Sequence, residues 1–322
     1  MRYVVYGAGA VGGVIGGHLH LADRETSLVA RGEHLTRIRA GGLRLDTGTG
    51  MHVIEAPATD TAAGIDWSAD TVCLLTVKSH QVAAALDDLA AHAPASTVVV
   101  CATNGVASEN AVLRRFARTY ALCVMLPSTH LEPGVVVAKC HPVPGLLDLG
   151  RVPSGTDEAC EAVAADLRTA GFESVPRPDI MAWKHRKLLM NVGNGVDAAC
   201  AEGKAADELA RLATEEGEQA IAAAGIPLVS AEEDRARRAD LLRTRTDSPV
   251  PRGGSTWQSM RRGSGSTEVD YLAGEIVLLG RLYGVPTPAC EVIQRVTSDL
   301  ARRGGPARSL DADQLLASLP DR

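Results

Sequence analysis

The first half of the chain alternates short apolar runs with stretches in which apolar residues recur every three or four positions. Apolar runs of this length, rich in Val and Leu, predict buried strands at residues 3–6, 27–30, 71–77, 97–102 and 120–126. The intervening periodicity predicts helices at residues 82–91, 109–116 and 157–170. Apolar strands separated by helices are typical of a doubly wound parallel sheet covered on both faces, so we expect a Rossmann-like α/β domain. Two further β-rich runs, 134–138 and 145–149, predict a hairpin-like extension of the same sheet.

From about Pro178 the pattern becomes helical throughout. Helical spacing continues through residues 180–201, 205–224, 270–283 and 290–300, with no convincing strand pattern. We therefore predict a Rossmann domain at 1–177 and an all-helical domain at 178–322, with a hinge at 176–178. Residues 243–254, rich in Arg, Thr, Pro and Gly, predict a mobile loop.

The first predicted strand runs directly into a G-x-G-x-x-G turn, and an apolar helical stretch follows it. In a dinucleotide fold the first glycine makes the tight turn, the second lets the backbone approach a pyrophosphate, and the third lets helix and strand pack closely. The alternative is a glycine-rich turn without a ligand, because the chain has 32 glycines. The strand before the motif and the helix after it favour a dinucleotide site, formed by Gly7, Ala8, Gly9, Ala10, Val11 and Gly12.

Composition excludes several classes of protein. A formal net charge of −6 argues against nucleic acid as the main partner, since phosphate binding needs a basic surplus. No apolar run approaches the roughly 18 residues of a membrane helix, and the N-terminus has no signal-peptide pattern, so a cytoplasmic location is expected. The seven cysteines are scattered, with no C-x-x-C pair and no His at metal-ligand spacing. They predict buried free thiols and no metal site.

The end of the second predicted strand indicates which cofactor is bound. An NAD enzyme has an Asp or Glu about 20 residues beyond the last glycine to accept from the ribose hydroxyl. Here Arg31 stands at that point, followed by Glu33. A guanidinium suits a 2′-phosphate, which favours NADP(H). The alternative is a solvated Arg31, with Glu33 serving the ribose.

Polar residues also follow the next two predicted strands. Lys78 and Gln81 follow the strand at 71–77, and Asn104 follows the strand at 97–102. The carboxyl edge of a parallel sheet is where ligands bind, and an Asn amide can bridge a cofactor and a substrate oxygen. Alternatively, Lys78 is a solvated strand-end lysine and Asn104 with Gly105 forms a turn.

The helical half carries a polar stripe on one predicted helix. Lys187, Asn191 and Asn194 fall within about 60° of one helix face. Buried amides without partners are costly, so they are expected to meet a ligand, water or another polar group. Lys184 and Arg186 are expected to reach solvent.

A second polar group lies further along the helical half. Ser255 and Thr256 precede one helix, and Thr267 and Glu268 precede the next. Alternatively, these residues are structural: hydroxyl side chains cap helix N-termini, and an acidic side chain in the first turn interacts favourably with the helix dipole. Together with a lysine and two amides, they suit a pocket for a small hydroxylated acid.

Taken together, these residues resemble the ketopantoate reductase (2-dehydropantoate 2-reductase) family over nearly the whole chain. The resemblance implies a Rossmann domain, a dimer-capable helical domain and NADPH-dependent reduction of a 2-keto acid to a 2-hydroxy acid. A small-molecule keto acid and a homodimer are thus the implied partners. The matching segments are Gly7 to Gly12, Arg31 to Leu35, Thr76 to Gln81, Asn104 with Gly105, Lys187 with Asn191, and Thr267 to Leu272.

The resemblance also implies roles for single residues. Lys187 looks like the general acid, and a fixed ammonium is suited to stabilising and protonating a developing alkoxide. Glu268 is similar to the glutamate that contacts the nicotinamide end and the substrate. The remaining implied roles are substrate hydroxyl and keto ligands (Asn191, Asn194), a group shared by cofactor and substrate (Asn104), carboxylate binding (Thr256, beside Ser255) and the cofactor cleft (Lys78, Gln81).

The chain departs from the family pattern on the substrate side. Where the family has Ser-Ser-Met-x-Gln-Asp, this chain has Ser255 to Met260 with Thr, Trp, Gln and Ser between them. The glycine-arginine pair before Thr267 is replaced by Ser264 and Gly265, and Asn-Pro-Leu-Thr by Asn194-Gly-Val-Asp197. Ketopantoate is therefore the leading substrate, with two alternatives. One is a relative that reduces another branched or aromatic 2-keto acid, and the other is a dinucleotide sensor without turnover.

Overall fold

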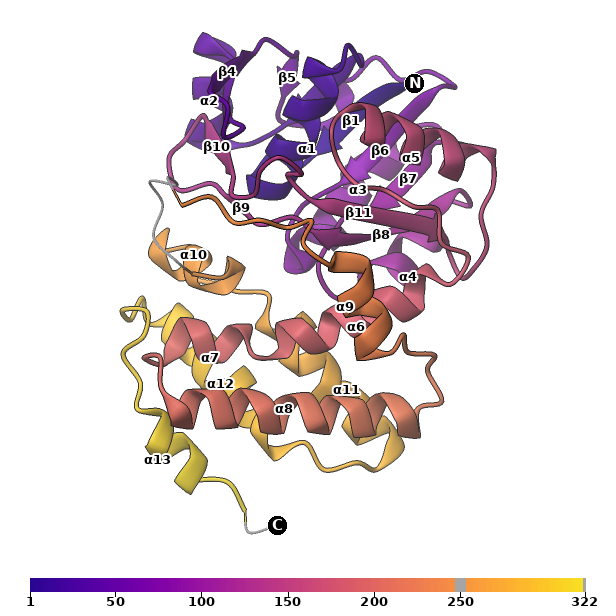
Figure 1. Cartoon of the computed structure of the whole chain (residues 1–322). Helices are drawn as coiled ribbons and strands as arrows, with labels where there is room; N and C mark the ends of the chain where they lie inside the picture. Colours follow the sequence, from indigo (N-terminus) through magenta and orange to yellow (C-terminus); the bar gives the residue numbers. More distant parts are fainter. Residues whose placement is uncertain (247–252, 321–322) are drawn as a thin grey trace. The chain divides into compact units, whose positions relative to one another are not determined.

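The structure is a computed structural model that describes residues 1–246 and 253–320 (Figure 1). The chain forms two compact units, and neither follows the sequence as one continuous range. The first unit comprises Met1–Thr103, Ser108–Met181 and the described part of Glu232–Val250. The second comprises Asn104–Ala107, Ala182–Ala231 and the described part of Pro251–Arg322. Each unit thus takes a segment from the other half of the predicted division at 177/178.

A seven-stranded sheet forms the centre of the first unit, with the strand order β11-β8-β7-β6-β1-β2-β5. All neighbouring strands are parallel except β11, which pairs antiparallel with β8. The order outward from β1 is that of a Rossmann fold, which confirms the predicted fold class. Ligands bind at the switch point of such a sheet, here between β1 and β6. The strands are β1 (Arg2–Tyr6), β2 (Thr26–Val29), β5 (Ala58–Thr59), β6 (Thr71–Leu75), β7 (Val98–Cys101), β8 (Thr119–Met125) and β11 (Leu146–Arg151).

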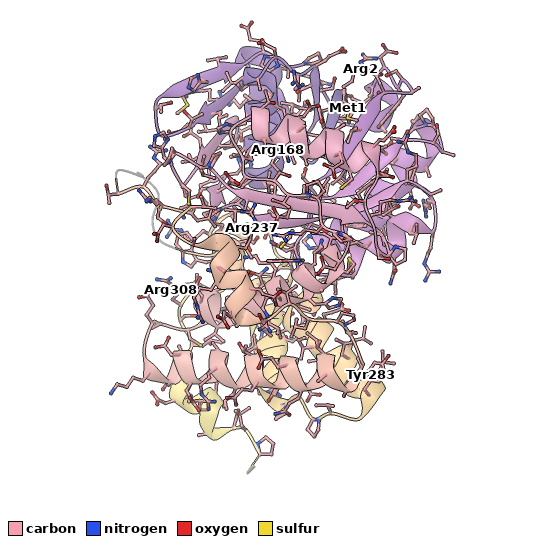
Figure 2. All side chains as sticks on the ribbon, turned by 45° about the vertical axis from the view of Figure 1, so that its right-hand side comes forward. Met1, Arg2, Arg168, Arg237, Tyr283 and Arg308 are labelled. Carbon is pink, nitrogen blue, oxygen red and sulfur yellow. The ribbon has the colours of Figure 1, made fainter. Side chains whose placement is uncertain are left out.

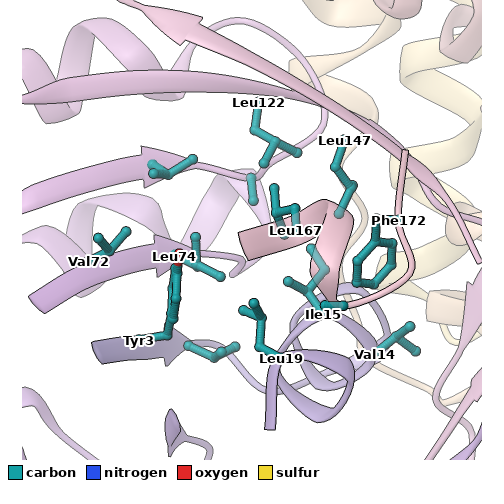
Figure 3. Packing of buried hydrophobic residues seen from close by; sticks show 14 of the residues in the cluster. Tyr3, Val14, Ile15, Leu19, Val72, Leu74, Leu122, Leu147, Leu167 and Phe172 are labelled. Carbon is teal, nitrogen blue, oxygen red and sulfur yellow. The ribbon is translucent and has the colours of Figure 1, made fainter. Parts of the chain in front are cut away.

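Both faces of this sheet are buried under helices. Alternate residues of β1 point to opposite faces: Tyr3 and Val5 belong to one apolar cluster, and Val4 and Tyr6 to the other. The Tyr3 cluster includes residues of α1 and α5, and Figure 3 shows Ile15 and Leu167 from these helices among them. The Val4 cluster includes residues of α3 and α4. The helices of this unit include α1 (Ala10–Leu21), α2 (Gly32–Gly41), α3 (Val82–His92), α4 (Ser108–Leu113) and α5 (Glu158–Thr169).

A second, four-stranded sheet corrects one prediction. Its order is β4-β3-β10-β9, where β10 pairs parallel with β3 and antiparallel with β9. The predicted hairpin of 134–138 with 145–149 is therefore wrong, because β10 and β11 lie in different sheets. β10 finds its partner about 90 residues away in the chain, and no local pattern indicates such a pairing. The strands are β3 (Leu43–Asp46), β4 (Met51–Ile54), β9 (Ser128–Thr129) and β10 (Val135–Ala138).

Asp148 on β11 connects two distant segments to the first unit. Its carboxylate accepts from Arg237 through Nε at 2.9 Å and Nη2 at 2.8 Å, and from Arg177 Nε at 3.2 Å. Arg237, labelled in Figure 2, lies on α9 (Ala231–Arg238). Arg177 also donates its backbone N–H to Leu149 O at 2.8 Å. The predicted hinge at 176–178 therefore pairs with β11, and the chain enters the second unit only after Met181.

Residues 243–246 of the predicted loop 243–254 lie on the first unit, whereas residues 253–254 belong to the second. The backbone N–H of Arg245 donates to Lys139 O at 2.9 Å, and that of His141 donates to Arg243 O at 3.1 Å. The Arg245 guanidinium pairs with Asp46 at 2.8 Å, and both side chains are largely buried. Residues 247–252 of the predicted loop lie outside the described residues.

The second unit is helical, as predicted. The predicted helix at 180–201 is divided at Gly193 into α6 and α7. A Cβ on Gly195 would lie 2.6 Å from Ile293 Cγ2 and 2.7 Å from Thr297 Oγ1, so this glycine lets α7 pack directly on α12. The helices are α6 (Ile180–Val192), α7 (Asn194–Ala199), α8 (Lys204–Ala223), α10 (Ser255–Arg261), α11 (Ala273–Tyr283), α12 (Pro288–Arg302) and α13 (Ala312–Ala317), with the 3₁₀ turn η3 (Val269–Tyr271).

The cysteines match their prediction. All seven are free and buried. Burial raises the pKa of the Cys73 thiol, which makes a thiolate unfavourable there. Within the described residues, no group of three or more His, Cys, Asp or Glu side chains is arranged to hold a metal ion. Over the same residues, no helix combines the length and the apolar character needed to cross a membrane.

Candidate active site

The glycine turn follows β1 at the switch point of the large sheet. Gly7 has φ +113°, a conformation that L side chains rarely adopt, and a Cβ there would lie 2.8 Å from Val77 N. A Cβ on Gly12 would collide with Thr76, Gly7 O and Val5, so this glycine allows α1 to pack against the sheet. At Gly9 no atom lies within 4 Å of the Cβ position. The turn is thus closed around its first and third glycines and open at the second, where a ligand would approach the backbone.

Thr76, at the end of β6, holds the glycine turn in place. Its Oγ1 donates to Gly7 O at 2.8 Å, and its backbone N–H donates to Tyr6 O at 3.0 Å. No individual role is predicted for Thr76 from the sequence. Its place at the end of a predicted strand could have indicated this contact, because the carboxyl ends of adjacent parallel strands lie at the same sheet edge.

His34, on α2, supports the turn from the other side. The backbone N–H of Gly134 donates to His34 Nδ1 at 2.8 Å, which leaves the proton on Nε2. Nε2 lies 2.7 Å from Ala8 O and donates to it. The His130 ring lies beside it, with the centroids 4.1 Å apart. Burial lowers the pKa of His34, against the raising effect of its bond to Ala8. His34 is therefore neutral and connects α2, the glycine turn and the segment before β10.

We expect His34 to make the first unit sensitive to acid. Because its folded-state pKa lies below the ordinary 6.5, the unfolded chain binds the proton first as the pH falls. The stability contributed by neutral His34 is complete well above pH 6.5 and is lost as the pH falls below it. His34→Gln keeps a donor for Ala8 and an acceptor for Gly134 but cannot titrate.

Urea unfolding from about pH 8 to about pH 5 tests this expectation. The wild type should lose more stability than His34→Gln over that range. His18, whose burial lowers its pKa to about 4, contributes the same acid loss to both proteins and cancels in the comparison. Identical pH dependence in the two proteins would remove the proposed role of His34.

Arg31 lies at the start of α2 and lines a pocket of about 470 Å³. The side chain is exposed, so its guanidinium can turn toward a ligand. Glu33, the alternative ribose group, does not line this pocket, and it pairs with Arg37 at 3.2 Å on the surface of α2. Of the two, only Arg31 lines this pocket. The other lining residues are not among the predicted site residues: Gly32, Leu35, Thr36, Asp60 and Thr61.

Lys78 and Gln81 lie just beyond β6. Gln81 Oε1 accepts from the backbone N–H of Lys78 at 3.2 Å, and the Gln81 N–H donates to Lys78 O at 2.8 Å. Gln81 therefore stabilises the local turn, which orients the chain at Lys78. Both residues lie in the first unit with the glycine turn and Arg31.

The second unit brings Asn104 and Asn191 together, although 87 positions separate them. Asn191 Nδ2 lies 3.4 Å from Asn104 Oδ1, which is a long hydrogen bond, and Asn191 is buried. Gly105 has φ +74°, and a Cβ there would lie 2.7 Å from Tyr271 O. Glycine at this position lets the Asn104 turn lie against η3, and Glu268 is the N-cap of η3.

Lys187 lies one turn before Asn191 on α6 and is partly buried. Glu268 is 4% exposed, which is uncommon for a carboxylate outside a functional or paired setting. Two neighbouring predictions are wrong. Lys184 is 3% exposed instead of solvated, and Arg186 donates to Val229 O at 2.7 Å and pairs with Glu218. A long basic stem can pack along apolar surface, which helical spacing alone does not reveal.

Asn194 begins α7 and lies near the start of α10. A Cβ on Gly254 would lie 3.8 Å from Asn194 Oδ1. Gly254 is the N-cap of α10, so Ser255 and Thr256 follow immediately, and Thr256 is buried. Seven predicted site residues lie in the second unit, six from the helical half of the chain and Asn104 from the first half: Asn104, Lys187, Asn191, Asn194, Ser255, Thr256 and Glu268.

Comparison with known proteins identifies the family of this chain. The family model described as ketopantoate reductase PanE/ApbA matches residues 3–153, and its C-terminal model matches residues 179–301. The chain belongs to the ketopantoate reductase family. This confirms the resemblance and the predicted enzyme class, which is an NADP(H)-dependent oxidoreductase acting on CH–OH groups.

Relatives and solved structures agree with this assignment. The 2-dehydropantoate 2-reductase of Halobacterium salinarum is 30% identical over 325 residues, covering 94% of this chain and 98% of that protein. A PanE/ApbA family ketopantoate reductase from Ralstonia eutropha superimposes with a TM-score of 0.78 at 26% identity, covering 94% and 99% of the two chains. D-mandelate dehydrogenase with NADH and anilino(oxo)acetate has a TM-score of 0.81 at 22% identity with the same coverage, which shows a shared fold.

Proposed function

We propose that this protein reduces a 2-keto acid to the 2-hydroxy acid with NADPH, and that ketopantoate is its leading substrate. The observation that carries the proposal is the contact of Asn191 with Asn104, one helical turn from Lys187. Two amides and an ammonium supply donors suited to a keto oxygen and a hydroxyl. The names of the relatives support ketopantoate as the substrate.

The residues of the first unit fit a dinucleotide. The backbone at Gly9 has open space where a Cβ would otherwise project, and the exposed Arg31 guanidinium lines a pocket where it would meet the 2′-phosphate. When bound, NADPH supplies the hydride. The residues that would hold it are Gly7, Ala8, Gly9, Ala10, Val11, Gly12, Arg31, Lys78 and Gln81, with Asn104 and Glu268 at the nicotinamide end.

The side chains of the second unit would complete the reaction. The Lys187 ammonium donates its proton to the carbonyl oxygen as that oxygen gains negative charge. Asn191 and Asn194 donate to the keto and hydroxyl oxygens, which fixes the orientation of the carbonyl. Thr256, beside Ser255, binds the carboxylate. Glu268 is the second catalytic residue, and we propose that it contacts the substrate and the nicotinamide end.

A related substrate is the second candidate. The segment from Ser255 to Met260 departs from the family pattern, and it places a buried Trp257 next to Thr256. We propose that this ring contacts the substrate side chain, which favours another branched or aromatic 2-keto acid as the alternative.

Steady-state assays of NADPH oxidation with ketopantoate and with straight, branched and aromatic 2-keto acids test the proposal. We expect ketopantoate to give the highest kcat/KM. A background rate with ketopantoate and turnover of another acid would establish the alternative substrate. NADPH binding without turnover of any acid would refute the proposed reaction and favour a sensor.

The proposal includes a homodimer in the cytoplasm. Leu278, Leu282 and Tyr283 leave an apolar surface exposed near the end of α11, which suits association of two copies. Sedimentation equilibrium of the wild type should give twice the mass of the chain. A monomer at working concentration would remove this part of the proposal.

A further inference from the structure

Asp197 on α7 joins two distant segments of the second unit. Its Oδ2 accepts from the backbone N–H of Gly254 at 3.0 Å, and its Oδ1 accepts from Arg308 Nη2 at 2.8 Å. The partners lie 57 and 111 positions away in the chain. Each oxygen of the carboxylate thus accepts from a different segment. A neutral amide of similar size has only one acceptor oxygen and could not accept both bonds in this way.

Arg308 is itself fixed from several directions. Its Nε donates to Asp197 O at 3.2 Å, and its backbone N–H donates to Ala198 O at 2.8 Å. A further ion pair joins Nη1 to Glu202 at 3.0 Å. Arg308, labelled in Figure 2, has φ +60°, which is uncommon for a residue other than glycine. Such a conformation persists only where surrounding contacts over-determine it, as they do here.

The Gly254 end of this arrangement leads directly to the substrate side. Gly254 is the N-cap of α10, and its carbonyl accepts from Gln258 N at 3.0 Å. A Cβ on Gly254 would lie 3.2 Å from Asp197 Oδ2, so the two residues are in close contact. Any movement of Gly254 would shift Ser255 and Thr256, which follow it in the first turn of the helix.

We infer that Asp197 and Arg308 form a clamp that positions Ser255 and Thr256 for the substrate carboxylate. Both are positioning residues, because they act through Gly254 and touch no reacting atom. The inference rests on the proposed function, in which Thr256 binds that carboxylate. It gives the C-terminal segment a role in substrate affinity. It also gives a role to Asp197, which stands where the family pattern has Thr.

Kinetics with the keto acid that the wild type reduces best test the clamp. Asp197→Asn leaves one acceptor oxygen and should raise KM by about tenfold, the effect of losing one charge-assisted hydrogen bond. The value of kcat and the Kd for NADPH should change less than about twofold. Arg308→Ala should raise KM in the same direction, and Arg308→Lys should restore part of the loss. Glu202→Ala is the matched control: it removes only an exposed ion pair, which contributes little to holding Arg308, so KM should change by less than about twofold.

Hydrogen exchange of the same variants provides a readout that is independent of turnover. Asp197→Asn should accelerate exchange of the amides at residues 254–258, while α8 keeps its protection. Unchanged exchange at 254–258 together with an unchanged KM would overturn the clamp. Faster exchange throughout the second unit would show a general structural role and would also overturn it. If the wild type reduces no keto acid, the proposed function fails, whereas local exchange at 254–258 still tests the clamp.

Discussion

Replacing Lys187 with Ala should lower kcat by about 100-fold or more, because general-acid catalysis contributes about 10² to 10⁴ in rate. The variant loses both the proton donor and the positive charge that stabilises the forming alkoxide. NADPH affinity should change little, since the cofactor residues other than Asn104 and Glu268 lie in the first unit. Stopped-flow or steady-state NADPH oxidation gives kcat, and fluorescence titration gives the Kd for NADPH.

Two further variants separate charge from proton donation. Lys187→Arg keeps the positive charge but gives up a proton poorly at neutral pH, so it should remain severely impaired. Lys204→Ala removes an exposed lysine at the start of α8 and should behave like the wild type. Wild-type turnover by Lys187→Ala would show that another group, or water, delivers the proton.

The large sheet could be predicted from the sequence because its strands are buried on both faces. A strand such as β6 is buried along its whole length, and a glycine turn or a helix follows β1, β2, β6 and β7. The pattern of apolar residues along the sequence indicates this kind of burial directly. The small sheet left no comparable signal, because β4 alternates exposed Met51 and Val53 with less exposed residues over only four positions. Its pairing depends on contacts distant in sequence.

It was also not predictable from the sequence that each unit takes a segment from the other half of the chain. α9 is a short helix made almost entirely of charged residues, with no apolar face to show which half of the chain it packs against. The ion pairs of Arg237 with Asp148 and of Arg245 with Asp46 decide its place. A charged residue gives no indication of its partner in a single sequence, and Arg237 and Asp148 are 89 positions apart.

Some residues of the candidate site could likewise be predicted from the sequence, and others could not. Residue types with an evident chemical task, such as Lys187, Asn191 and Arg31, stood out from their neighbours. Supporting residues did not, because His34 and Asp197 act by hydrogen bonds to the backbone of other segments. Such bonds depend on the fold and require no particular spacing, so only coordinates reveal them.

Replacing Arg31 with Ala should weaken NADPH binding by about 100-fold and change NADH binding by less than about threefold. Loss of a bidentate guanidinium–phosphate contact is worth about 1.5–3 kcal/mol, and this contact exists only with the 2′-phosphate. Arg37→Ala is the matched control on the same helix, because Arg37 is exposed and pairs only with Glu33 among the contacts described on α2. Isothermal titration with both cofactors at one salt concentration measures the ratio.

The same titration decides between Arg31 and Glu33. If Glu33 accepted the hydrogen bond of the ribose hydroxyl, Glu33→Ala would weaken NADH binding. Arg31→Ala would then affect NADPH and NADH binding equally. The pocket argues for the opposite result, since Arg31 lines it and Glu33 does not. Raising the salt concentration should reduce the NADPH preference of the wild type toward that of Arg31→Ala, because an exposed guanidinium is screened. Equal loss of both cofactors in Arg31→Ala would assign this arginine to the structure of α2 and not to the phosphate.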